Sequence, residues 1–293
     1  MRSKWALGFL SALAGCSGSS PTGSAMTWLL AAGDIAICGA SSAAESTAAS
    51  TAKILTANSN AAVLTLGDNV YDNGTIDEYR NCYGPTWGVV KDRTYPSPGN
   101  HEYGTIDADG YFTYFAERAG PARRGYYSFD LGNWHIVSLN SNIDAARGSS
   151  QEQWLRADLA AHRSQRCTLA YWHHPVFSSS SVHGNNPKMA DIWQTLQSYG
   201  VEVVLSGHDH DYERFAPQAF DGTADPAGVR EFVVGTGGAT PYPFAAPKPN
   251  SEARIDNTHG VIRFALQDGS YDWEFLPVAP NGQWDSGHAL CHD

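Results

Sequence analysis

Short apolar runs of strand length alternate with helix-like segments from residue 26 onward. This alternation predicts strand–helix–strand units, in which helices cover a sheet on both faces. The chain contains no internal repeat and no long low-complexity block that would indicate another architecture. We therefore expect an α/β fold in which the carboxyl ends of several strands meet at one edge, where sheets of this type assemble their sites.

The expected elements follow from the apolar runs and from the residues that interrupt them. Expected strands are residues 27–32, 62–66, 93–98, 168–172, 201–205, 230–234, 261–266 and 271–276. Residues 126–131 and 134–139 flank Gly132 and Asn133, a pattern typical of a hairpin. Expected helices are residues 41–57, 151–162 and 187–199, with Ser149 or Ser150 as a cap for the second. Residues 241–250 contain four prolines and should form a loop.

Length and charge limit the possible functions. The chain has 293 residues, 42% of them apolar, which suits a single catalytic domain over residues 26–293. The formal net charge is −11 and the pI is close to 5.4. A nucleic-acid-binding surface requires clustered Lys and Arg, so none is expected. An acidic protein that handles an anionic substrate needs local cations, and metal ions can supply them.

Residues 1–25 have the pattern of an export signal. Two basic residues precede a short apolar run, residues 5–14, and small residues follow it. The run is too short to span a bilayer as a mature helix, so no transmembrane span is expected. Cys16 ends a stretch that resembles the lipobox of bacterial lipoproteins; the alternative is secretory cleavage near Ala25. Either way the Ser- and Gly-rich stretch after Cys16 predicts a flexible tether, and the expected location is extracytoplasmic, as a secreted protein or a lipid-anchored bacterial lipoprotein.

Four cysteines remain when Cys16 is set aside: Cys38, Cys82, Cys167 and Cys291. An even number suits two disulfides in an oxidising compartment. Three pairings are possible. We favour Cys38 with Cys82 and Cys167 with Cys291, because the first two lie just past neighbouring strands of the expected site; free buried thiols are the alternative. The chain has no Cys-x-x-Cys pair, so a structural zinc knot is not expected.

Polar side chains of the metal-binding type come directly after five of the expected strands. They are Asp34, Asp68, Asn100 with His101, His173, and His208 with His210. A lone aspartate after a strand is more often a helix cap or a turn former. The repetition of such side chains after five strands instead indicates that they converge at one edge of the sheets and bind metal.

The ordered set Asp34, Gly67-Asp68-x-x-Tyr71, Gly99-Asn100-His101-Glu102, His173 and Gly207-His208-x-His210 resembles the purple acid phosphatases, which belong to the calcineurin-like metallophosphoesterases. The resemblance covers roughly residues 28–275 and matches every metal-ligand position of that family. It implies a four-layer α/β/β/α sandwich of two mixed β-sheets flanked by helices. It also implies a binuclear, metal-dependent phosphoric ester hydrolase, and an acid-phosphatase-type phosphomonoesterase is the main expectation.

The resemblance also assigns the ligands. Asp34, Tyr71 and His210 would hold iron(III); Asn100, His173 and His208 would hold a divalent ion (zinc, iron or manganese); Asp68 would bridge the two ions. Carboxylate and phenolate oxygens are hard donors suited to a trivalent ion, whereas imidazole and amide suit a divalent one. The wider family has Asp-x-His at its first motif, but Ala36 stands at the histidine position here. Together with Tyr71, this departure favours the purple acid phosphatases over the phosphatases and nucleases of the wider family that lack the tyrosine.

Two further histidines, His101 and His183, match outer histidines of the family. They are expected to bind the phosphate and to protonate the leaving group. Glu102 and His174 are expected to support the ligands from behind. The implied chemistry is in-line attack by a hydroxide that two adjacent metal ions generate, with no covalent enzyme intermediate.

Three alternatives compete with this interpretation. A phosphodiesterase or nucleotidase would use the same ligands, so the ligand set does not separate it from a monoesterase. A catalytically inactive, secreted binding module would be expected to have a broken ligand set. The His-x-His-x-Asp-His box of metallo-β-lactamase-type hydrolases needs a histidine where this chain has Tyr212. The expected partner is a small phosphate ester.

Overall fold

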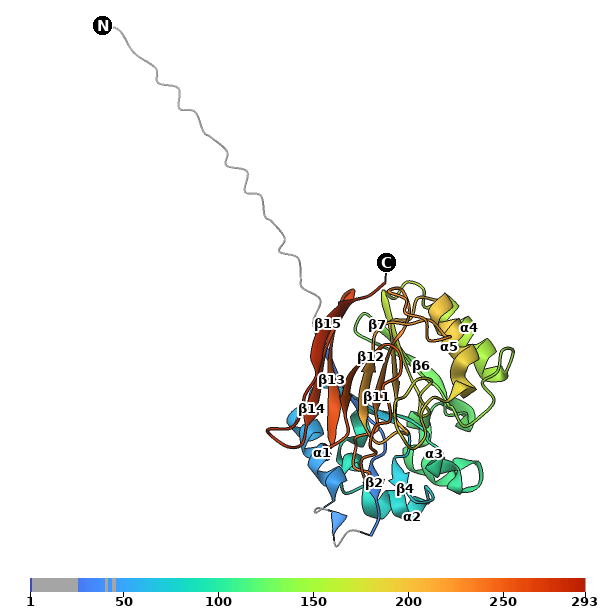
Figure 1. Ribbon diagram of the computed structural model, residues 1–293, viewed down its shortest axis with the longest axis vertical. Helices are drawn as coiled ribbons and strands as arrows, with labels where there is room; N and C mark the ends of the chain where they lie inside the picture. The colour runs from blue at the N-terminus through green and yellow to red at the C-terminus, as the bar shows by residue number, and fades with distance from the viewer. Residues whose placement is uncertain (2–25, 40–41, 44–45, 293) are drawn as a thin grey trace.

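The computed structural model describes residue 1 and residues 26–39, 42–43 and 46–292. The expected signal, cleavage site and lipidation site lie outside the described residues. Two large β-sheets pack face to face, with α1 (Thr47–Ala57) outside one sheet and α4 (Ser150–Ala161) and α5 (Ala190–Ser198) outside the other (Figure 1). This is the expected four-layer α/β/β/α arrangement.

The first sheet has the strand order β15-β14-β13-β1-β3-β5. Its parallel strands are β1 (Thr27–Ala32), β3 (Ala62–Leu66) and β5 (Thr94–Ser97). Its antiparallel strands are β13 (Gly260–Gln267), β14 (Ser270–Pro277) and β15 (Ser286–Leu290). The three parallel strands therefore end at a common edge.

The second sheet has the order β12-β10-β11-β9-β8-β7-β6. Its parallel strands are β7 (Trp134–Ser138), β8 (Cys167–Tyr171), β9 (Val203–Ser206) and β11 (Arg230–Val234). The antiparallel strands are β6 (Tyr127–Leu131), β10 (Tyr212–Phe215) and β12 (Ser251–Ile255), and β6 forms the expected hairpin with β7. Two short strands, β2 (Ala36–Ile37) and β4 (Val70–Tyr71), pair with each other outside the large sheets.

Successive side chains of the central strands point into two different cores. Those that lie between the two sheets include Ile136, Leu169 and Leu205. Those that pack under α4 and α5 include Val137, Ala170 and Val204. Because neighbouring residues of a strand face opposite sides, an unbroken apolar run buries both faces of the sheet at once.

Helix α1 begins later than expected, because Ser46 caps it: the Ser46 hydroxyl accepts the Ala49 amide at 3.2 Å. The expected Ser149 cap of α4 is present and accepts the Glu152 amide at 3.2 Å. The expected helix 187–199 is a 3₁₀ turn, Pro187–Met189, followed by α5. The sequence did not predict the short helical segments α2 (Ile76–Glu78), Tyr79–Tyr83, Trp87–Arg93, His101–Gly104, Ile106–Ala108, α3 (Asp109–Phe115), Ala116–Ala119 and Pro121–Arg123.

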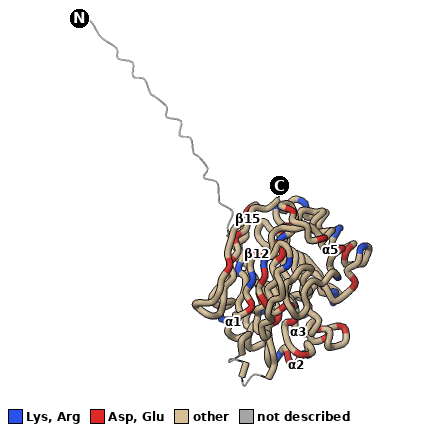
Figure 2. Tube along the Cα trace, viewed as in Figure 1, with Lys and Arg blue, Asp and Glu red and all other residues tan. Residues whose placement is uncertain are grey.

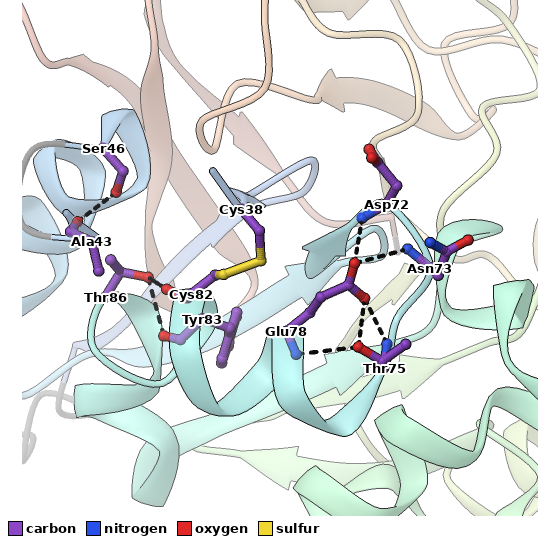
Figure 3. Close-up of a disulfide and its surroundings, with 10 residues drawn as sticks. All are labelled: Cys38, Ala43, Ser46, Asp72, Asn73, Thr75, Glu78, Cys82, Tyr83 and Thr86. Carbon is purple, nitrogen blue, oxygen red and sulfur yellow. Dashed lines mark hydrogen bonds between the residues drawn. A yellow bond between two sulfur atoms is a disulfide. The ribbon is translucent and has the colours of Figure 1, made fainter. Parts of the chain in front are cut away.

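Both predicted disulfides are confirmed. Cys38 pairs with Cys82 and Cys167 pairs with Cys291, with Cα–Cα distances of 5.5 and 5.7 Å. The first joins the segment after β2 to the helical segment Tyr79–Tyr83 (Figure 3). It therefore ties together two segments that follow neighbouring strand ends.

The loop after Tyr71 is held by a capping box at the start of α2 (Figure 3). The Thr75 hydroxyl accepts the Glu78 amide at 3.2 Å, and the Glu78 carboxylate accepts the Thr75 amide at 2.8 Å. The same carboxylate accepts the Asp72 amide at 2.8 Å. These contacts fix the backbone immediately after Tyr71.

Lys and Arg positions are scattered among Asp and Glu positions along the trace in the view of Figure 2. Within the part of the chain that the structure describes, no helix combines the length and the apolar character that crossing a membrane would need.

Candidate metal centre

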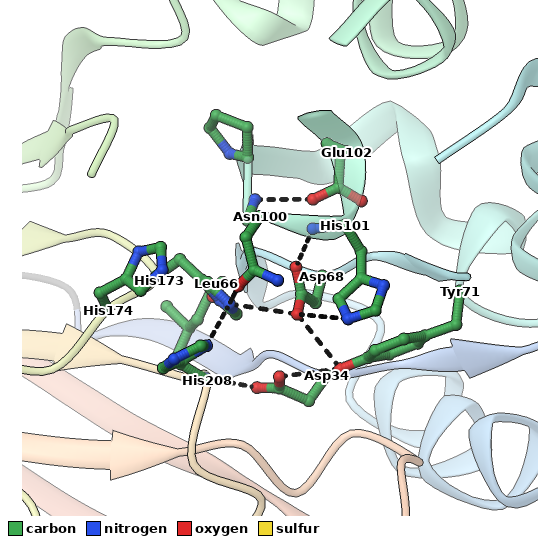
Figure 4. A network of polar contacts seen from close by, with 12 residues as sticks. Asp34, Leu66, Asp68, Tyr71, Asn100, His101, Glu102, His173, His174 and His208 are labelled. Carbon is green, nitrogen blue, oxygen red and sulfur yellow. Dashed lines mark hydrogen bonds and ion pairs between the residues drawn. The ribbon is translucent and has the colours of Figure 1, made fainter. Parts of the chain in front are cut away.

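Five strands deliver polar side chains to one cluster at the joint edge of the two sheets (Figure 4). Asp34 follows β1, Asp68 follows β3, Asn100 and His101 follow β5, His173 follows β8, and His208 and His210 follow β9. Asp34, Asp68 and His208 have φ values of 60°, 43° and 71°, a left-handed conformation that few non-glycine residues adopt. Strained backbone of this kind often occurs at functional sites. The structure thus brings together side chains that the sequence places far apart.

Two glycines allow these segments to approach one another. A Cβ on Gly67, whose φ is 81°, would lie 2.5 Å from Nδ1 of His173. A Cβ on Gly99 would lie 2.1 Å from Oδ1 of Asp68. Only glycine fits at these two positions without displacing a side chain of the cluster.

The Tyr71 hydroxyl lies at the centre of one half of the cluster. It is 2.9 Å from Asp34 Oδ1, 3.3 Å from Asp68 Oδ2 and 3.2 Å from His210 Nε2. His210 Nε2 is in turn 3.4 Å from Asp34 Oδ1. The four side chains expected to surround iron(III) therefore face one another.

The other half of the cluster is centred on Nε2 of His173. This atom is 3.1 Å from Asn100 Oδ1, 3.2 Å from Asp68 Oδ2 and 3.2 Å from His208 Nδ1. Asp68 Oδ2 therefore lies close to a donor atom of each half. The Asp68 carboxylate thus lies between the two halves.

The electrostatics of the cluster suit bound cations. Burial, followed by the carboxylates of Asp34 and Asp68, raises the pKa of Tyr71 well above its ordinary value. Burial and neighbouring imidazoles lower the pKa of His208, which keeps that ring neutral. Burial alone would lower the pKa of His173, but the Asp68 carboxylate raises it to about 9. A cation would displace these protons, and the set of carboxylate, phenolate, amide and imidazole donors fits a hard and a borderline metal ion.

Donor atoms of Asp34, Asp68 and His173 lie within 4.8 Å of one another, as do those of His173, His174 and His208. His174 was expected to support the ligands from behind. Its Nδ1 is 2.8 Å from the Ser141 hydroxyl, and burial lowers its pKa to about 3. A neutral ring at this position is consistent with contact to a neighbouring cation.

Carbonyl groups orient the two buried histidines of the cluster. His173 Nδ1 is 2.8 Å from the Leu66 carbonyl oxygen, and His210 Nδ1 is 2.8 Å from that of Thr240. Each contact fixes the ring so that Nε2 points toward the cluster, the arrangement common in metal sites.

Glu102 lies fully buried behind the cluster and binds backbone rather than a histidine ring. Its carboxylate accepts the amides of Asn69 at 2.9 Å and Gly99 at 2.6 Å, and the Tyr79 hydroxyl at 2.9 Å. Because these amides flank Asp68 and Asn100, Glu102 joins the loops after β3 and β5. Burial, followed by the Asp68 charge, raises the pKa of Glu102 to about 7.

The two histidines expected to act on the substrate lie beside the two halves of the cluster. The His101 ring is 4.3 Å from the Tyr71 ring, its Nδ1 is 2.6 Å from the Asp72 carbonyl oxygen, and its Nε2 is 3.9 Å from Asp68 Oδ2. His183 is exposed and stacks on His208, with ring centroids 4.1 Å apart and planes 23° apart.

Sequence reasoning missed Tyr242, which stacks on His210 with centroids 3.9 Å apart and an interplanar angle of 13°. It also missed the buried Glu213, which anchors the loop that carries His183. Tyr242 lies in the proline-rich loop, where no short motif indicates a site. Neither contact has a local sequence signal, because each joins segments about thirty residues apart.

Comparison with known proteins shows which family this chain resembles. The sequence profile of the calcineurin-like phosphoesterases matches residues 28–212, a range that contains every residue of the cluster. Purple acid phosphatase 15 of Arabidopsis thaliana is 30% identical over 219 residues, which cover 63% of this chain and 41% of that protein. Purple acid phosphatase 18 of the same plant is 32% identical over 209 residues, covering 66% and 43%. The chain thus matches less than half the length of these curated relatives.

A solved structure shows the same fold. Purple acid phosphatase PPD1 from yellow lupin (Lupinus luteus) seeds superposes with a TM-score of 0.77 and 18% identity, covering 92% of this chain and 55% of that chain. The family profile spans more than half of the chain and includes all the strand ends that form the cluster. The chain therefore belongs to the calcineurin-like phosphoesterase family.

Proposed function

We propose that this chain hydrolyses phosphate monoesters with the help of two adjacent metal ions, an iron(III) ion and a divalent zinc, iron or manganese ion. The supporting observation is the convergence of seven donor side chains, with neighbouring donor atoms 2.9–3.4 Å apart. The similarity to proteins named purple acid phosphatases supports the same activity.

The two halves of the cluster suggest how the ions would be held. Asp34, Tyr71 and His210 would hold iron(III); Asn100, His173 and His208 would hold the divalent ion; Asp68 would contact both. When bound, the two ions would neutralise the phosphoryl oxygens and lower the pKa of a water molecule that attacks phosphorus. The residues of the chain would orient the phosphate and the attacking water, and they would supply the protons.

His101 and His183 would complete the reaction from opposite halves of the cluster. Nδ1 of His101 donates a hydrogen bond to the Asp72 carbonyl oxygen. Nε2 is therefore directed toward the cluster and, when protonated, can donate to a phosphoryl oxygen. His183 is exposed above His208, where it can take a proton from solvent and deliver it to the leaving oxygen.

A comparison of two esters tests this proposal. Metal-loaded protein should turn over para-nitrophenyl phosphate with a higher kcat/KM than bis(para-nitrophenyl) phosphate, and chelation should abolish both activities. A strong preference for the diester would instead indicate a phosphodiesterase of the same fold. A metal-free protein that turns over neither ester and is unaffected by chelators would indicate a binding module without catalysis.

We further propose that the protein works outside the cytoplasm. Two disulfides support this location, because cytoplasmic thiols are normally kept reduced. The intact mass of the mature protein distinguishes the two export routes: a lipid-modified Cys16 at the new terminus indicates an anchored lipoprotein, and cleavage near Ala25 indicates a secreted one. Retention of residues 1–25 in the mature protein would contradict export.

A further inference from the structure

Two loops beside the metal cluster pair with each other. Residues 178–186, the histidine loop, carry His183, and residues 241–250, the proline loop, carry Tyr242. The Ser181 amide donates to the Pro243 carbonyl oxygen at 3.0 Å, and the Ala245 amide donates to the Ser179 carbonyl oxygen at 2.8 Å. The two loops therefore form a short antiparallel bridge.

One buried carboxylate fastens both loops. Glu213, on β10, is fully buried, and its Oε2 accepts the Ser179 amide at 2.7 Å. Its Oε1 accepts the hydroxyls of Ser179, at 2.5 Å, and of Ser251, the first residue after the proline loop. The Ser179 hydroxyl oxygen in turn accepts the amide of Lys248 at 2.9 Å. The contacts of Ser179 hold the histidine loop to β10 and join it to the proline loop, and the contact of Ser251 holds the start of β12, where the proline loop ends.

The fastened loops carry two aromatic rings against the cluster. His183 stacks on His208, Tyr242 stacks on His210, and the rings of His183 and Tyr242 are 5.7 Å apart. The histidine loop has a second link nearby, because the Ser178 hydroxyl donates at 2.5 Å to the carboxylate of Asp209, the residue between His208 and His210. His183 is exposed, so its position depends on the backbone of its loop.

We propose that Glu213 is a positioning residue: by fastening the histidine loop to the proline loop, it holds His183 and Tyr242 as one wall on the leaving-group side of the cluster. This inference rests on the proposed phosphate ester hydrolysis with His183 as the proton donor. Small misplacements of a proton donor cost large factors in rate, and the loss grows with the basicity of the leaving group.

The variant Glu213→Gln tests the inference, because an amide keeps the volume of the side chain but cannot accept hydrogen bonds at both positions. For phenyl phosphate, whose leaving group needs a proton, kcat/KM should fall about tenfold or more. For dinitrophenyl phosphate, whose leaving group is stable as an anion, it should fall about twofold or less. Ser179→Ala should show the same pattern more weakly, and metal content should be unchanged in both variants.

Glu202→Gln is the matched control. Like Glu213, Glu202 is a buried carboxylate; it accepts the backbone amides of Thr168 at 2.6 Å and His292 at 3.3 Å. It lies immediately before β9, whereas the donors of the cluster lie after the other end of that strand and of its neighbours. Both esters should be turned over by this variant at the wild-type rate. Equal losses on the two esters for Glu213→Gln, or no loss on either, would overturn the positioning role. If Glu213→Gln loses metal or does not fold, Ser179→Ala tests the role by the same comparison, the loss of kcat/KM on phenyl phosphate against the loss on dinitrophenyl phosphate.

Hydrogen exchange separates failure of this inference from failure of the proposed function. In Glu213→Gln, backbone amides of both loops should exchange faster, whereas Glu202→Gln should leave their exchange unchanged. Faster exchange in neither loop, or in one alone, contradicts the fastening. A wild-type protein that turns over neither ester would refute the proposed function, and the exchange measurement would still test the fastening.

Discussion

Replacing Tyr71 with phenylalanine removes one oxygen atom from the centre of the donor cluster. The lost hydroxyl donates to Asp34 Oδ1 at 2.9 Å and lies 3.2 Å from His210 Nε2. The ring is 6% exposed and packs 4.3 Å from the His101 ring, a contact that phenylalanine can keep. A hydrogen bond to a charged group contributes about 1.5–3 kcal/mol, and Asp34 retains the amide of His208 as a donor. The metal-free variant should therefore lose about 2 kcal/mol of unfolding free energy, or roughly 4–8 °C in unfolding temperature.

The visible spectrum of the same variant tests the role of Tyr71. Without a cation, burial and the neighbouring carboxylates keep the pKa of Tyr71 high, so the phenol stays protonated. Wild-type protein with iron(III) should show a phenolate charge-transfer band, and Tyr71→Phe should lose it while far-ultraviolet circular dichroism is unchanged. Tyr111→Phe is the control, because this buried hydroxyl donates at 3.1 Å to the carbonyl oxygen of Pro96. A band that persists in Tyr71→Phe, or disappears in Tyr111→Phe, would refute the assignment.

Three further experiments have defined outcomes. Gly67→Ala should lower metal content, because its Cβ would lie 2.5 Å from an imidazole nitrogen of the cluster; Gly148→Ala, with a φ of 84° but open surroundings, carries only backbone strain of about 1–2 kcal/mol and should keep its metal. Equal metal content in the two variants would contradict this reasoning. Replacing Cys38 and Cys82 with serine should cost about 4 kcal/mol of unfolding free energy, because their disulfide closes a loop with a sequence separation of 44 residues. An unchanged denaturant midpoint would argue against this stabilisation. Burial raises the pKa of Glu202 to about 7, so the fold favours its protonated form, and this stabilisation is lost as the pH rises through 7. The unfolding free energy of Glu202→Gln, relative to that of wild type, should therefore rise by about 2.5 kcal/mol as the pH increases from about 5 to about 8. A difference between the two proteins that stays constant across this range in denaturant unfolding would disprove this prediction.

Most of the strands could be predicted because their apolar runs are continuous. A strand such as β9 is buried on both faces and therefore has a strong local signal. Strands β10, β12 and β15 were missed. Charged residues interrupt the first two, and Arg214 on β10 pairs with Glu252 on β12, so these charges are balanced only once the strands lie side by side. β15 lies at an edge, and its alternating exposed residues leave no apolar run.

Most of the candidate donors could be located because they stand within a few residues after a strand. Asp34, Asp68 and His173 are all two residues beyond a strand end, so locating the strand locates the donor. The wall beside the cluster could not be predicted in this way. Its contacts, such as that of Glu213 with Ser179, join segments 34 residues apart and depend on how β10 pairs in the second sheet.

The metal content of the purified chain is the most direct test of a binuclear centre. Elemental analysis should find two metal ions per chain, one of them iron. Asp68→Asn should lower the content of both ions, because Asp68 lies between the two halves of the cluster, whereas His208→Ala should lower only the divalent ion. Protein that binds no metal after exposure to iron and zinc, or that binds one ion and keeps it in Asp68→Asn, would contradict the account.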